Sequence, residues 1–146
     1  MATNTDFVIL KQALLIVGEY YGIIETNDMI YIGSDLPDEF SGSNYTKKLK
    51  GALAKANAAQ GLPELIEIAS KKRYKENLKE KHDFDAKYGW YRYDTKFALP
   101  VYNEDQELER FNVFQAVLLI RHAQDGKLYL YDLVNIKKET GKPLEQ

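Results

Sequence analysis

The sequence predicts an α+β fold, in which N-terminal helices pack on one face of a C-terminal antiparallel meander. Three observations support this prediction. Apolar residues recur with helical spacing before about residue 82, alternate with polar residues from Tyr88 onward, and are interrupted by a turn at Asp125-Gly126. Because the helical and the two-residue periods occupy successive parts of the chain, we expect helices and sheet to form separate layers.

Length and composition indicate one domain over 1–146, with a helical and hairpin part at about 1–82 and a sheet part at about 88–140. The 146 residues, 45% of them hydrophobic and 29% charged, are enough for one core. The absence of cysteine excludes thiolate nucleophiles, disulfides and Cys-based metal sites. Because Lys11 and Gln12 interrupt the first apolar run, we expect no signal peptide and no membrane span, and a soluble cytoplasmic protein.

Three helices and a short hairpin are expected before the sheet. The first helix covers 7–20, begins at Thr5 or Asp6, stops near Gly22, and is apolar nearly all round, so it should be buried. A hairpin follows with arms at 23–26 and 29–32, and then a loop at 33–44. The second helix, over 45–60, carries an apolar stripe with small residues. Pro63 suits the first turn of a third helix that runs to about Lys81.

Three strands make up the predicted meander. In the first, over 90–101, the alternation from Tyr91 onward predicts one buried and one wet face. The second, over 108–122, is apolar on both faces and should be central. The third covers 128–137 and joins the second through Asp125-Gly126, whose positive φ angles suit a tight primed turn. Strand parity then places Arg121 and His122 on opposite faces unless a bulge intervenes.

Charge is unevenly distributed along the chain, whose net charge is −2. Residues 1–40 contain one lysine against seven acids, whereas residues 41–100 contain thirteen basic residues against seven acids. A basic middle region is typical of an anion or nucleic-acid footprint, and equally of solvated lysines on helix faces. With a pI near 5.7, the chain does not resemble a dedicated duplex-DNA binder.

No motif assigns chemistry by spacing alone. The sequence contains no GxGxxG, GxxxxGK[ST], HExxH or GxSxG pattern. His82, Asp83 and Asp85 could bind a divalent cation, but one imidazole and two carboxylates are too few, and a charge cluster at a helix end is favoured. We therefore expect neither a metal nor another cofactor.

A cationic and aromatic set remains as the candidate site. Metal-independent RNA cleavage needs a base for the 2′-OH, an acid for the leaving 5′-oxygen, and cations for the phosphate. Histidine can serve in either proton role, since imidazole ordinarily changes charge near neutral pH. The candidate catalytic residues are His82, His122 and Thr140, and the candidate substrate-binding residues are Lys87, Tyr91, Arg92, Arg121, Lys137 and Lys138.

Each candidate also has a structural interpretation. His122 shares strand parity with Ile120 and could be a hydrogen-bonded histidine at the rim of the core, while Arg121 could be solvated. His82 could complement a helix dipole. Lys137 and Lys138 could mark a solvated strand end. If a site exists, we expect it where His122 meets His82 or Lys138 at the rim of the sheet.

Two long segments of the sequence resemble a known family. They are KYGWYRYDTKFALPVYNEDQELERFNVFQAVLLIRHAQDGKLYLYDLVNIKKETGKPLE and, upstream, IYIGSDLPDEFSGSNYTKKLKGALAKANAAQGLPELIEIA. Both resemble the C-terminal domain of phage and integrative-element polyvalent (MuF-type) proteins. Such domains look related to the barnase/EndoU/RelE-like class of small α+β endoribonucleases, with helices followed by an antiparallel sheet.

The resemblance implies a function and its residues. It implies a metal-independent endoribonuclease, a toxin or effector of a mobile element, whose positions match His82, Lys87, Arg121, His122 and Thr140, with Lys137 on phosphate. No unique acid–base pair is assigned. The alternative is a non-catalytic module that binds protein or nucleic acid, for example an anti-defence or packaging-associated domain. The expected partners are RNA, or an immunity or host protein; the oligomeric state is open.

Overall fold

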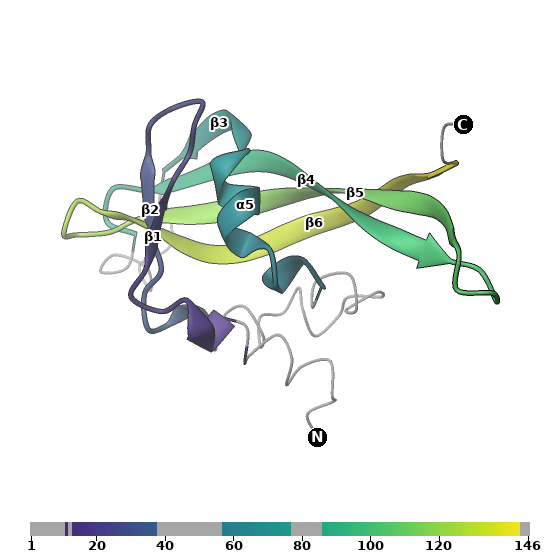
Figure 1. The fold of residues 1–146 in the computed structure, drawn as a ribbon. Coiled ribbons are helices and arrows are strands. Elements are labelled where there is room, and N and C mark those ends of the chain that lie inside the picture. Colours follow the sequence, from purple (N-terminus) through teal and green to yellow (C-terminus); the bar gives the residue numbers. More distant parts are fainter. Residues whose placement is uncertain (1–10, 12, 38–56, 77–85, 144–146) are drawn as a thin grey trace, which may run out of the picture.

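One mixed β-sheet dominates the computed structural model, which describes residues 11, 13–37, 57–76 and 86–143 (Figure 1). Its six strands have the order β1-β2-β6-β5-β4-β3. They are β1 (Tyr20–Gly22), β2 (Met29–Tyr31), β3 (Ser70–Lys75), β4 (Trp90–Tyr102), β5 (Leu108–His122) and β6 (Leu128–Pro143), and the labelled helix is α5 (Leu62–Glu67). The predicted α+β class is confirmed at this level, with sheet far outweighing helix.

The sheet is mixed because β2 joins β6 in parallel. Ile30 pairs with Leu128 and Tyr31 with Tyr129, whereas β3, β4, β5 and β6 form the expected antiparallel ladder. The prediction of a purely antiparallel sheet is therefore wrong at this edge. The long connection between β2 and β6 allows either direction, and the parallel one buries Ile30 completely.

The meander itself lies where the two-residue period predicts it. Strand β5 has the predicted bounds, β4 ends one residue later, and β6 continues to Pro143 instead of ending near Lys137. Strand β5 lies between β4 and β6, as its apolar faces predict. Along β4 the side chains of Tyr93 and Thr95 are buried while Lys96 is exposed, which confirms the predicted alternation.

The turn between β5 and β6 differs from the predicted two-residue type. The N–H of Ala123 donates to the carbonyl of Lys127 (3.0 Å), so three residues form the loop. Gly126 has a φ of 84°, and Asp125 is not among the residues with positive φ. Asp125 instead accepts hydrogen bonds from the Lys127 N–H (2.8 Å) and the Tyr129 hydroxyl (2.6 Å). Glycine supplies the one left-handed position and Asp125 stabilises the loop.

The predicted third helix is the largest error. It was expected to run to about Lys81, but α5 ends at Glu67 and the chain continues as β3. Beyond Ile68 the sequence has no apolar stripe with which a helix could pack. Residues 70–75 instead pair with β4 at the edge of the sheet, where their charged side chains are exposed and discourage further pairing.

The N-terminal elements are shorter than predicted and shifted. Residues 13–15 are helical, but the chain leaves the helix at Gly18, whose φ is 91°, so the helix does not reach Tyr20. Leu14 and Leu15 are 56% and 68% exposed, so the expected burial on all sides is wrong. The hairpin forms, but its first arm is β1 rather than 23–26. Most of the predicted second helix lies outside the described residues, of which 57–59 are helical.

The core lies at one end of the long strands. It joins sheet residues to α5, which is anchored by a hydrogen bond from the Thr95 hydroxyl to the Leu65 carbonyl (2.9 Å). Figure 1 shows α5 across β4–β6 near β1 and β2, while the β4–β5 turn projects at the far end. The largest fully buried side chains are Tyr93, Ile23, Ile30, Leu36, Leu62, Ile66, Leu118, Ile120 and Leu130. This end of the sheet is therefore the one rigid enough to position a site.

Candidate functional site

His122 ends β5 at the core end of the sheet, between two tyrosine rings. Its ring centroid lies 5.1 Å from that of Tyr88 and 5.9 Å from that of Tyr91. The backbone of Gly89 and Tyr88 extends the ladder past β4, since the His122 N–H donates to the Gly89 carbonyl (2.9 Å) and the Tyr88 N–H donates to the His122 carbonyl (3.0 Å). The imidazole is thus held on a regular strand, partly exposed and flanked by aromatic faces.

Two lysines complete this group, which we call the His122 cluster: His122, Tyr88, Tyr91, Lys72 and Lys87. Lys72 Nζ lies 4.5 Å from the centroid of the Tyr91 ring, and Lys87 Nζ lies 5.7 Å from that of Tyr88. Both distances fit cation–π contacts. The cluster therefore combines one imidazole, two ammonium groups and two aromatic faces.

The tautomer of His122 follows from one hydrogen bond. His122 Nε2 lies 3.1 Å from the Gly126 carbonyl oxygen in the β5–β6 turn. A carbonyl only accepts, so Nε2 carries the proton in the neutral ring and Nδ1 carries the lone pair. The arrangement leaves Nδ1 as the atom of this ring able to accept a proton.

Lys72 is held in place by Asp28, in the turn between β1 and β2. Its ammonium lies 2.9 Å from Asp28 Oδ2, which also accepts hydrogen bonds from the Tyr93 hydroxyl (2.6 Å) and the Thr26 hydroxyl (2.7 Å). Burial alone would raise the pKa of Asp28, but these hydrogen bonds outweigh it and the pKa lies below its ordinary value. Asp28 therefore stays ionised at neutral pH and orients Lys72 beneath Tyr91.

The close packing of Tyr74 on this cluster requires a glycine at position 89. The Tyr74 and Tyr91 centroids lie 5.2 Å apart. A Cβ at Gly89 would lie 2.6 Å from Tyr74 Cε2 and 2.8 Å from the Lys75 carbonyl oxygen, and the φ of Gly89 is 99°. Glycine alone allows β3 and the start of β4 to approach this closely.

Arg121 lies on the opposite face of the sheet from His122, as parity predicts, but the expectation that it is solvated is wrong. Its side chain is buried, with the guanidinium 4.3 Å from the Tyr129 ring centroid and Nη2 3.3 Å from Asp35 Oδ1. A pocket of about 600 Å³ borders this group and is also lined by Gly33. Guanidinium stacking on a ring explains the burial, so Arg121 belongs to a different surface from His122.

The other predicted candidates are spread along the strands. Lys138 pairs with Phe114, eight residues before His122, so roughly 26 Å of strand separates them. Thr140 pairs with Val113, still further away. Lys137 pairs with Gln115, and Arg92 pairs with Leu119 on the face of Arg121. Of the predicted set, the structure brings together only His122, Tyr91 and Lys87, while His82 lies outside the described residues.

Lys72, Asp28 and Tyr88 belong to the site but were missed by sequence reasoning. Lys72 lies in the segment predicted to be helical, so no strand register could place it next to Tyr91. Asp28 contacts Lys72 and Tyr93 from far away in the sequence, and no local pattern carries that information. The one available signal is Gly89 directly before a period-two strand, since glycine at such a position often marks close approach of two backbones.

Metal and membrane features were also considered for the residues that the structure describes. Within these ranges no group of three or more His, Asp or Glu side chains could hold a metal ion. His82, Asp83 and Asp85 are not among them. In the same ranges no helix has the length and apolar character needed to cross a membrane. No protein-family model matches the chain, and no curated protein matches it.

Proposed function

We propose that the chain is a metal-independent endoribonuclease-like domain of a phage or mobile element, with the His122 cluster as its site. The observation that carries the proposal is the position of His122 between Tyr88 and Tyr91, with Lys72 and Lys87 against the outer ring faces. The resemblance of the sequence to the polyvalent-protein domain supports it independently. The finer architecture of that class, helices on one face of the sheet, rests here on α5 and its bond to Thr95.

Each group in the cluster has a role in this reaction. His122 Nδ1 accepts the proton of the 2′-hydroxyl, whose oxygen then bonds to phosphorus while the bond to the 5′-oxygen breaks. The products are a 2′,3′-cyclic phosphate and a 5′-hydroxyl, whose proton comes from a second group; the sequence offers His82 for it. Lys72 and Lys87 supply positive charge to the phosphate oxygens. Tyr88 and Tyr91 offer faces on which unpaired bases stack.

The test is cleavage of a single-stranded RNA in the presence of chelator, with end-group analysis for cyclic phosphate. Loss of a proton-transfer group ordinarily lowers the rate by about 10²–10⁴-fold, which is the effect expected of His122→Ala. Lys138→Ala is the matched control, because this lysine is exposed and far along the same sheet. Failure of the wild type to cleave, or full activity of His122→Ala, would refute the proposal; His82→Ala tests the second proton group.

One observation favours the alternative, a non-catalytic module that binds nucleic acid or protein. The cations that were expected around His122 are distributed over both faces and both ends of the strands. A broad basic surface without a convergent acid–base pair is typical of binding rather than of cleavage. This alternative predicts that the wild type retains a labelled RNA in a gel-shift assay while leaving it intact for hours.

A further inference from the structure

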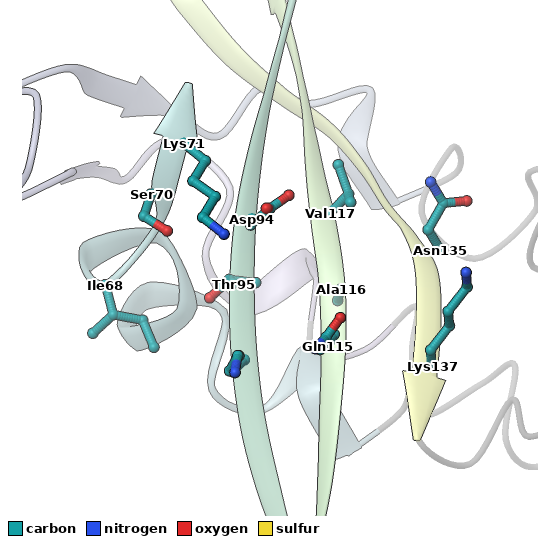
Figure 2. Close-up of a pocket in the computed structure, with 11 residues that line it drawn as sticks. Ile68, Ser70, Lys71, Asp94, Thr95, Gln115, Ala116, Val117, Asn135 and Lys137 are labelled. Carbon is teal, nitrogen blue, oxygen red and sulfur yellow. The ribbon is translucent and has the colours of Figure 1, made fainter. Parts of the chain in front are cut away.

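We propose a second site in this protein: a pocket that binds the phosphate group of a nucleotide, free or within a nucleic-acid chain. It lies on the sheet face of Asp94 and Gln115, between β3 and β6, has a volume of about 660 Å³, and is shown in Figure 2. Val117 in its wall is five residues from His122, so roughly 17 Å of β5 separates the two sites. The proposal holds whether or not the chain cleaves RNA.

The strand register gathers the polar residues of the pocket on one face. Lys96 pairs with Gln115, and Gln115 pairs with Lys137, so the two lysines flank one glutamine in a row across three strands. In Figure 2, Lys71 extends from β3 toward β4, while Asn135 and Lys137 extend from β6 on the other side of β5. Cations therefore border the pocket from both sides.

Two backbone irregularities present these side chains. Lys71 and Asn135 have φ angles of 57° and 53°, and each lies at a break in strand register. The Lys71 conformation is held from both sides, since its N–H donates to Glu25 Oε2 (3.1 Å) and its carbonyl accepts from Arg73 Nη1 (2.7 Å). Left-handed lysine is unfavourable, and β-bulges often redirect side chains beside functional sites. Both irregularities line the same pocket, which indicates a ligand site.

The charges in the pocket are not all equally available. Lys96 Nζ lies 3.1 Å from Glu139, which also accepts a hydrogen bond from the Gln115 amide, and Arg73 binds Asp94 (2.8 Å). Across the part of the chain that the structure describes, neither Lys71 nor Lys137 forms an ion pair. Asp94 is thus neutralised by Arg73, and the pocket keeps two cations for a ligand.

These groups fit a phosphate on a larger molecule. A phosphate has enough oxygens and charge to accept from two ammonium groups and the Asn135 amide together. The volume of about 660 Å³ exceeds what one phosphate needs and leaves room for a sugar or base beside Ile68 and Val117. A nucleotide, or one unit of a single strand, meets both requirements.

Binding can be measured by amide chemical-shift changes on addition of inorganic phosphate, adenosine monophosphate, or a 2′-O-methyl oligoribonucleotide, which cannot be cleaved through the 2′-oxygen. We expect the largest changes at Val117, Asn135 and Lys137. Saturation by the mononucleotide identifies a small ligand, and a response to the oligonucleotide alone identifies a polynucleotide backbone. No change in the pocket with any of the three probes would overturn the proposal.

Variants separate this pocket from general electrostatic attraction and from the His122 cluster. Lys137→Glu should weaken binding at least tenfold, whereas Lys138→Glu, the same charge change at the next residue, should leave the affinity within twofold. Lys96→Ala should have less effect than Lys71→Ala, because Glu139 already binds Lys96. Equal losses in Lys137→Glu and Lys138→Glu, or loss of binding in His122→Ala, would contradict the assignment.

Discussion

At the scale of single residues, Asp28 connects parts of the chain that are far apart in sequence. Its carboxylate, between β1 and β2, accepts from Tyr93 of β4 and contacts Lys72 of β3. Burial, and then the hydrogen bond to Asp28, raises the pKa of Tyr93, so its hydroxyl keeps its proton and keeps donating. This buried polar group is satisfied by its partners, and removing any of them should be expensive.

Tyr93→Phe should therefore lower the free energy of unfolding by about 1.5–3 kcal/mol at pH 7, since it removes a hydrogen bond to a charged group. Because the pKa of folded Asp28 is depressed, its contribution is present above the unfolded value, near 4, and is lost as pH falls through the folded value. Urea unfolding from pH 2 to 7 should show a flatter acid limb for Tyr93→Phe. Tyr102→Phe, at an exposed position, should behave as wild type.

Gly89→Ala should destabilise the protein by about 1–3 kcal/mol, because the new Cβ meets both Tyr74 and the backbone of Lys75 in a left-handed conformation. Gly18→Ala is the matched control: its φ is 91°, but nothing lies within 4 Å of the added Cβ. Its loss should be the smaller of the two in chemical denaturation. Equal losses would show that backbone conformation alone, and not close packing on Tyr74, requires glycine at position 89.

At the scale of elements, the two hairpin turns of the meander use the same loop with different residues. In each the first residue donates its N–H to the carbonyl four positions on: Asn103 to Glu107 (2.9 Å) and Ala123 to Lys127 (3.0 Å). The residue before the closing position is left-handed in both, Gln106 with φ 64° and Gly126 with φ 84°. Only the second turn has the residue that suits this position.

Gln106→Gly should stabilise the protein by roughly 1 kcal/mol, since left-handed backbone is unfavourable for a side chain with a Cβ. Gln124→Gly is the control with the opposite sign, because residue 124 is not left-handed and glycine there only adds freedom to the unfolded chain. Thermal unfolding of both variants checks the pair. A lower midpoint for Gln106→Gly would contradict the assigned turn geometry.

At the scale of the whole molecule, the sheet extends beyond its core. The buried side chains of β4 and β5 are Tyr93, Thr95, Ala116, Leu118, Ile120 and Arg121, all in the half of these strands nearest β1 and β2. Toward the β4–β5 turn the same strands have only half-buried or exposed residues, including Tyr102 and Phe111. Strand pairing alone holds that half of the ladder.

Hydrogen exchange should therefore vary along β5. Amides from about 116 to 121 should exchange only through global unfolding, whereas those from 108 to 112 should exchange through local opening and be protected several kcal/mol less. Leu118→Ala should reduce the protection of the first group, and Leu108→Ala should leave it nearly unchanged. Uniform protection along β5 would contradict the inference that the core stabilises only one half.

Part of the fold and a small part of the site could be predicted from sequence. Alternation located β4 and β5, and Asp125-Gly126 located the hairpin, because a two-residue period and a turn residue act locally. The β3 segment was misread, since its strand state depends on the unpaired edge of β4 and not on its own residues. Lys72 and Asp28 were missed for the same reason, as their partners are fixed only when β3 and the β1–β2 turn meet.

The sequence by itself determined the α+β class, the meander, its main turn and the opposite facing of Arg121 and His122, because these depend on spacing between near neighbours in the chain. Only the tertiary structure decided the parallel pairing of β2 with β6, the burial of Arg121 on Tyr129, and the meeting of His122 with Lys72 and Lys87 through two tyrosines. Each of these is a contact between distant segments, whose free energy exists only once the core has brought them together.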